Sequence, residues 1–231
     1  MSGTSPLGGA ACIALIHATR LAVQPIEDAF ARHWPEAERL NLLDDSLPAA
    51  RTRTPGPDDR LRERFVALSR YAELAGADGI LYTCSAFGPE IEAARLAVTL
   101  PTLKPNEAMF DAALEIGTRV GLLATFPPSI APMQQELVGT ARLRSLEIDV
   151  QVGLATGAFE ALQRGDGELH DELVLGAARR FSGIDVLLLA QFSMARAAQR
   201  LGSRIDVPVL SSPDSAVRLL RRQVESRKRA P

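Results

Sequence analysis

The sequence has few cysteines, no long hydrophobic run and almost no net charge. Its 231 residues include two cysteines, too few for a disulfide framework. The longest apolar stretches, such as VLLLA from Val186, are far shorter than the roughly 20 residues of a membrane-spanning helix. No basic segment followed by an apolar run and a small-residue cleavage site opens the chain. These features predict a reduced, soluble, cytoplasmic protein without a membrane partner.

The charges are balanced. The 26 basic and 28 acidic residues give a net charge of −2, so no overall field favours nucleic acid as a partner. The basic C-terminal segment RRQVESRKRAP is typical of a solvated helix end. We expect the partners to be small molecules, in particular a carboxylate or related carbon acid, and further copies of the chain in a homo-oligomer.

Motifs that hold metals or nucleotides are also missing. The sequence contains no HExxH, no paired CxxC and no close histidine cluster. It has no GxGxxG after a strand and no GxxxxGK followed by Ser or Thr. GxSxG is absent too, and Ser193 lacks the flanking glycines of a nucleophile elbow. The sequence therefore predicts neither a metal site nor a cofactor.

Short apolar runs alternate with amphipathic segments along the whole chain. Continuous apolar runs suit strands of a sheet that is covered on both faces, and strand-helix alternation is typical of a parallel α/β fold. Strands are predicted over residues 12–18, 39–44, 79–84, 119–125, 148–153, 185–191 and 207–212. Helices are predicted over residues 25–34, 60–76 and 168–183, and an exposed loop over residues 51–59.

An internal repeat divides the chain into two similar halves. Residues 76–88 align with residues 183–195 at an offset of 107 positions. The aligned pairs are Asp78 with Asp185, Cys84 with Gln191, Pro101 with Pro208 and, at an offset of 106, Thr19 with Thr125. We therefore expect two pseudosymmetric α/β lobes, formed by residues 1–105 plus 208–231 and by residues 106–207. Ligands of open α/β sheets bind beyond the carboxyl ends of strands, so the site is expected in the cleft between the lobes.

Cys84 stands where a predicted strand gives way to a turn and a helix. A cysteine in a protein core is usually an inert small hydrophobe, as we expect for Cys12 inside the first strand. A helix N-terminus lowers the pKa of a thiol. The position therefore predicts a depressed pKa for Cys84 and a role as the essential catalytic group. The aligned Gln191 would face it from the other lobe.

Four motifs resemble the aspartate/glutamate racemase superfamily, which includes hydantoin racemases, maleate isomerases and arylmalonate decarboxylases. In chain order they are TCSAFGPEI, KPNEAM, GLLATFPPSI and LAQFSMA. The resemblance implies two pseudosymmetric α/β halves, no cofactor, and a cysteine from each half that exchanges a proton at a carbon beside a carboxylate. Cys84 matches the first of these cysteines. Thr125 and Ser129 match positions that hold the substrate carboxylate in this superfamily. From the repeat and the resemblance together, the expected substrate-binding residues are Thr19, Ser85, Ala86, Thr125, Ser129, Gln191, Phe192 and Ser193.

The second cysteine of the racemases falls on Gln191, and this is the main departure. An amide forms hydrogen bonds but does not exchange a proton near neutral pH. His17, after the first strand, is the candidate for a second acid or base; a structural histidine bonded to the backbone is the alternative. His170 is expected at the surface or in helix packing.

Several functions stay open. The resemblance implies a racemase-like isomerase. The single cysteine also fits one-sided chemistry: decarboxylation followed by protonation, double-bond isomerisation after thiol addition, or attack on an acyl group. A small-molecule binding protein that has lost catalysis is the alternative from another class.

Overall fold

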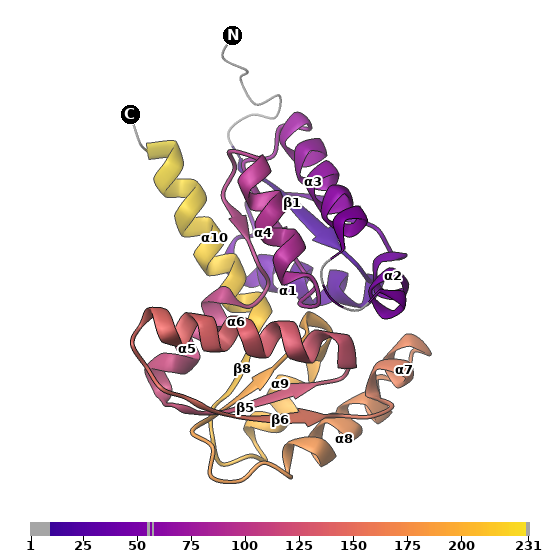
Figure 1. Cartoon of the computed structure of the whole chain (residues 1–231), viewed down its shortest axis with the longest axis vertical. Helices are drawn as coiled ribbons and strands as arrows, with labels where there is room; N and C mark the ends of the chain where they lie inside the picture. The colour runs from indigo at the N-terminus through magenta and orange to yellow at the C-terminus, as the bar shows by residue number, and fades with distance from the viewer. Residues whose placement is uncertain (1–9, 55, 57, 230–231) are drawn as a thin grey trace.

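Two four-stranded parallel sheets form the centres of two lobes (Figure 1). The computed structural model describes residues 10–54, 56 and 58–229. The first sheet contains β1 (Cys12–His17), β2 (Glu38–Leu43), β3 (Gly79–Tyr82) and β4 (Thr102–Leu103). The second contains β5 (Arg119–Ala124), β6 (Asp149–Leu154), β7 (Val186–Leu189) and β8 (Val209–Ser211). The predicted α/β fold with two similar halves is therefore confirmed.

Both sheets have the same topology. The strand order is β2-β1-β3-β4 in the first sheet and β6-β5-β7-β8 in the second, with every pair parallel. The two central strands of each sheet are almost entirely buried, as their continuous apolar sequence predicts. The edge strand β2 instead alternates between half-buried and exposed positions, so the prediction that every strand is continuously apolar is wrong there.

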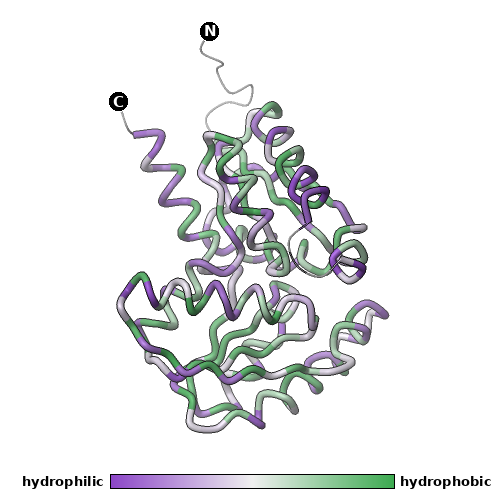
Figure 2. The backbone as a smooth tube through the Cα atoms, in the orientation of Figure 1, coloured by the Kyte–Doolittle hydropathy of each residue, from purple (hydrophilic) through white to green (hydrophobic). Residues whose placement is uncertain are grey.

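Helices cover both faces of each sheet. Those of the first lobe are η1 (Arg20–Ala22), α1 (Val23–His33), α2 (Leu47–Arg53), α3 (Asp59–Leu74), α4 (Gly88–Ala97) and α10 (Ser212–Arg229). Those of the second are α5 (Glu107–Ile116), η2 (Pro127–Ser129), α6 (Ile130–Leu143), α7 (Ala158–Gln163), α8 (Gly167–Ala178), η3 (Phe192–Met194) and α9 (Ala195–Gly202). Each sheet lies between two hydrophobic clusters, and the strands stand out as hydrophobic segments in Figure 2. No helix in the described part of the chain is both long enough and apolar enough to cross a bilayer.

The two halves share details as well as topology. In the first half, the Asp78 carboxylate accepts a hydrogen bond from the N–H of Cys12 at 2.8 Å. In the second half, the Asp185 carboxylate accepts one from the N–H of Arg119 at 2.9 Å. Both acceptors and both donors are 107 positions apart, which supports the internal repeat.

One predicted pair is shifted by a residue. Thr19 is the N-cap of η1, and the residue that caps η2 in the second half is Phe126. The fold therefore relates Thr19 to Phe126 at the common offset of 107 positions. The predicted pairing of Thr19 with Thr125 at an offset of 106 is therefore wrong. It aligned two identical residue types, which do not occupy equivalent positions after the two strands.

The C-terminal helix returns to the first lobe. Helix α10 packs on α1 and β3, and Figure 1 shows it running up the side of the first lobe. Strand β8, however, pairs with β7. The predicted boundary, at which the chain returns to the first lobe at residue 208, is therefore too early, because the second sheet extends to Ser211. The helix predicted over residues 168–183 is too long, since α8 already ends at Ala178.

Candidate active site

A small cavity lies where the carboxyl ends of the central strands of both lobes meet. Cys84, in the turn after β3, and Gln191, the N-cap of η3, both line it. The cavity has a volume of about 30 Å³, which is room for about one water molecule. The other lining residues are Thr19, Ala22, Pro48, Thr83, Ser85, Phe126, Phe159, Phe192 and Ser193. Any organic substrate must therefore push the walls apart.

Aromatic rings of the second lobe cover one side of this cavity. Phe126 comes from the end of β5 and Phe159 from α7, and their ring centroids lie 5.3 Å apart. Phe192 is 1% exposed and joins the hydrophobic cluster of the first lobe, so it binds the lobes together. An apolar substituent of a bound molecule would contact these rings.

The surroundings of Cys84 disfavour its thiolate. The side chain is half-buried and packs against the apolar cluster around Phe65 and Phe87. Burial raises the pKa of Cys84 to about 11, although the N–H of Ala86 and the charge of Arg51 act in the opposite direction. The prediction of a depressed pKa is therefore wrong. Helix α4 begins at Gly88, four positions after Cys84, so the thiol does not lie at the helix N-terminus.

This environment predicts slow alkylation of Cys84 near neutral pH. Because the thiolate is the nucleophile, a pKa of about 11 leaves only about one thiol in 10⁴ reactive at pH 7. We expect the iodoacetamide rate, followed by mass spectrometry in a Cys12→Ser background, to rise about tenfold per pH unit towards pH 11. A rate that levels off near pH 8 would contradict this effect of burial.

The side chain of Gln191 is held by its own lobe. Its Oε1 accepts hydrogen bonds from the N–H of Thr125 at 2.9 Å and from the Thr125 hydroxyl at 3.2 Å. Its Nε2 donates to the hydroxyl of Ser129, which in turn donates to the carbonyl of Phe126 at 2.8 Å. Thr125 and Ser129 are not among the residues that line the cavity. These two predicted substrate-binding residues lie behind Gln191 and satisfy its amide.

His17 does not reach the cavity. The side chain is fully buried, with Nδ1 2.9 Å from the Thr83 hydroxyl and Nε2 2.8 Å from Oδ1 of Asn41. Nδ2 of Asn41 donates to Glu27, which fixes the amide orientation, so Nε2 of His17 carries a proton. Burial lowers the pKa of His17 and keeps the ring neutral. The prediction of His17 as the second acid or base is therefore wrong.

Cys84 is consequently the one titratable side chain among the described residues that line the cavity. The Ser85 hydroxyl beside it is buried, with no hydrogen-bond partner in the described chain. Ala86 does not line the cavity with its side chain, but its N–H hydrogen-bonds the Cys84 sulfur. The first lobe thus supplies a thiol and a free hydroxyl, and the second lobe supplies an amide.

A family model described as Asp/Glu/hydantoin racemase matches residues 14–220. The chain belongs to this family. Allantoin racemase from Klebsiella pneumoniae has the same fold, with a TM-score of 0.69, 23% identity, and coverage of 94% of this chain and 89% of that one. Glutamate racemase from Francisella tularensis subsp. tularensis SCHU S4 gives a TM-score of 0.73 at 13% identity, covering 94% and 82%.

Two further matches have a lower TM-score or cover a shorter stretch of the chain. A cysteine-substituted mutant of arylmalonate decarboxylase gives a TM-score of 0.63 at 21% identity, covering 93% of each chain. A stretch of 135 residues is 28% identical to DNA mismatch repair protein MutS from Rhodopseudomonas palustris (strain BisB18). It covers 56% of this chain but only 15% of MutS, so it gives no information on activity.

This member of the racemase family has a buried ion pair beside its site that sequence reasoning missed. Arg51 was expected in an exposed loop, but it lies in α2 and is 5% exposed. It contacts Oε1 of Glu90, 1% exposed, at 2.6 Å, and its guanidinium stacks 4.9 Å from the ring centroid of Phe87. The sequence feature that could have revealed this helix is Pro48, because proline is favoured in the first turn of a helix and α2 begins after Ser46.

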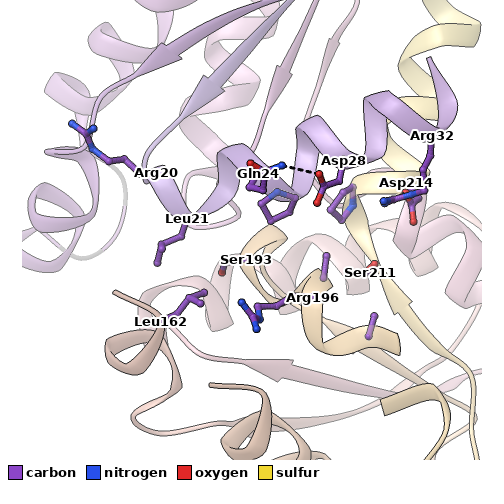
Figure 3. Close-up of a pocket in the computed structure, with 14 residues that line it drawn as sticks. Arg20, Leu21, Gln24, Asp28, Arg32, Leu162, Ser193, Arg196, Ser211 and Asp214 are labelled. Atoms are coloured by element: carbon purple, nitrogen blue, oxygen red, sulfur yellow. Dashed lines mark hydrogen bonds and ion pairs between the residues drawn. The ribbon is translucent and has the colours of Figure 1, made fainter. Parts of the chain in front are cut away.

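A larger groove opens next to the cavity of this racemase-family chain. It has a volume of about 670 Å³ and lies between α1 of the first lobe and α9 of the second (Figure 3). Ser193 lines both spaces, so the groove leads towards Cys84. Arg32, paired with Asp214 at 2.7 Å, and Arg196, paired with the buried Asp171 at 3.0 Å, lie along its walls. Asp28 and Asp214 also line this groove, so side chains of both charge signs face it.

Proposed function

We propose that this chain is a cofactor-independent enzyme that decarboxylates a small geminal dicarboxylate and protonates the product from one face with Cys84. The observation that carries the proposal is the lone thiol opposite an amide in the shared cavity. A racemase needs a base on one face of the carbon and an acid on the other. A decarboxylase needs only the acid, because departing CO₂ leaves the electron pair on the carbon.

The protonation state of Cys84 supports the same role. With a pKa of about 11, Cys84 is a neutral thiol at physiological pH, and a thiol is a proton donor. After CO₂ leaves, the electron pair spreads into the remaining carboxylate as an enediolate. The S–H proton of Cys84 then moves to the carbon, and the thiolate recovers a proton from water.

Neighbouring groups fit the charges of this reaction. The free hydroxyl of Ser85 is available to donate to the enediolate, where charge develops. The N–H of Ala86, which bonds the Cys84 sulfur, stabilises the thiolate that protonation leaves behind. Phe126 and Phe159 offer an apolar wall for the second substituent of the carbon.

Turnover of 2-substituted malonates in heavy water tests this proposal. We expect a monoacid with one deuterium at the α-carbon, detected by mass spectrometry and resolved by chiral chromatography. Cys84→Ala is the matched control and should form product at least about 100-fold more slowly than the wild type. Exchange and racemisation of a chiral monocarboxylate without release of CO₂ would contradict the proposed reaction.

A binding protein without catalysis is the second candidate. The hydrogen bonds of Thr125 and Ser129 to Gln191 favour it, because they take up two hydroxyl groups that were expected to bind substrate. Under this alternative, ligand affinity measured by calorimetry is unchanged in Cys84→Ser, and the wild type turns over none of the acids that it binds.

The lone thiol also predicts the stereochemistry. Because the Gln191 amide neither donates nor removes a proton near pH 7, the product is expected to be one enantiomer in large excess. Gln191→Cys should lower the enantiomeric excess by adding a donor on the second face. Gln191→Ser is the matched control, since it also removes the amide but adds no thiol. A racemic product from the wild type would contradict this prediction.

A further inference from the structure

Helix α3 lies on the outside of the first lobe (Figure 1). Its exposed face carries an apolar groove. The groove has a volume of about 560 Å³ and includes Val66, Ala67, Tyr71 and Leu74. Tyr71 is 56% exposed and Leu74 87% exposed, which is high for large apolar side chains on one helix face. None of these residues lines the Cys84 cavity or the groove beside it.

Two opposite charges lie on either side of Val66 and Ala67 in this groove. Glu63 and Arg70 are exposed, line the same groove and lie two helical turns apart, about 10 Å along the axis. They are too far apart along the helix to pair with each other, and neither has an ion pair or side-chain hydrogen bond within the described chain. By contrast, Arg62 pairs with Asp59 at 2.5 Å, and Arg64 with Asp44.

We propose that α3 pairs with α3 of a second copy of this chain, antiparallel about a two-fold axis between Val66 and Ala67. In this arrangement Glu63 of each copy faces Arg70 of the other, so two ion pairs form between the copies and each of the four charges gains a partner. The small side chain of Ala67 at the centre lets the helices approach closely. A two-fold contact requires such self-complementarity: one patch must offer both the charge and its partner.

The contact is small, so the dimer is expected to be weak. A helix of 16 residues is about 24 Å long, and pairing two of them buries less surface than a standard stable interface. The proposal is independent of the proposed decarboxylase activity, because α3 supplies no residue to the site.

Charge reversal with complementation tests the antiparallel pairing. Sedimentation velocity of the wild type from about 10 to 500 µM should show mass shifting towards two chains. Glu63→Arg and Arg70→Glu should each weaken self-association at least tenfold, because like charges then face each other twice. An equimolar mixture of the two variants should recover it, since every Arg at 63 or 70 then meets a Glu.

Matched controls separate this effect from a change of net charge. Glu115→Arg in α5 and Arg142→Glu in α6 reverse exposed charges elsewhere and should leave self-association unchanged. Circular dichroism confirms that every variant is folded. A wild type that stays monomeric over the whole range overturns the proposal, as do single variants that associate like the wild type. A mixture that fails to recover the association also overturns it.

Discussion

Replacing Cys84 with alanine is expected to lower kcat by about 10²–10⁴-fold, the usual contribution of a positioned acid in proton transfer. The reason is that the cavity offers no other titratable group among its described residues, so no neighbour can supply the proton. The measurement is single-turnover formation of monoacid from a 2-substituted malonate. Ligand affinity should change little, since the deletion removes one small, half-buried side chain.

Cys12→Ala is the control for this prediction. Cys12 lies in β1, half-buried, and does not line the cavity, so its loss should leave kcat within about twofold of the wild type. Equal loss of activity in both variants would point to a folding defect. Full activity in Cys84→Ala would remove Cys84 from the mechanism and with it the proposed one-sided protonation.

The two lobes have the same strand topology but different side chains at the site. Asp78 and Asp185 make the same hydrogen bond at the start of β1 and β5. At the other ends of the strands, Cys84 is available to a ligand, whereas Gln191 is bound to Thr125 and Ser129. The two halves thus share the hydrogen bonds at the start of their sheets but differ in the side chains at the site. This asymmetry is the structural basis for the one-sided protonation that we propose.

The sequence was sufficient for the fold because the apolar runs and the repeat are direct signals of buried parallel strands. It was also sufficient to bring Cys84 and Gln191 to one cavity, since both follow the central strands of their sheets. Strand β4 has only two residues and therefore leaves no pattern to detect. Strand β2 alternates because it lies at a sheet edge, which the sequence alone did not indicate.

The electrostatics of the site could not be predicted in the same way. The pKa of Cys84 depends on apolar neighbours from distant segments, which raise it despite the nearby turn. The state of His17 depends on Thr83 and Asn41, which come from two other strand regions. Such partners are set by packing across the sheet, and no local spacing reveals them.

Arg51→Met is expected to destabilise the protein by about 3–5 kcal/mol, as is typical when one partner of a buried ion pair is removed. Glu90, 1% exposed, would keep a carboxylate in an apolar environment with no cation to balance it. The measurement is urea unfolding followed by circular dichroism. For comparison, Glu225→Gln, which breaks the exposed pair between Arg221 and Glu225, should change the free energy of unfolding very little, because solvent screens exposed ion pairs.

The double variant Arg51→Met, Glu90→Leu distinguishes the effect of the unpaired Glu90 carboxylate from the effect of lost packing around Arg51. It removes both charges and fills similar volume, so most of the lost stability should return, because an apolar pair of this kind is often as stable as the ion pair. If the double variant is no more stable than Arg51→Met, the loss comes from packing against Phe87 rather than from the unpaired Glu90. Since Arg51 lowers the pKa of Cys84, its removal should also slow alkylation of that thiol further, in the single and the double variant alike.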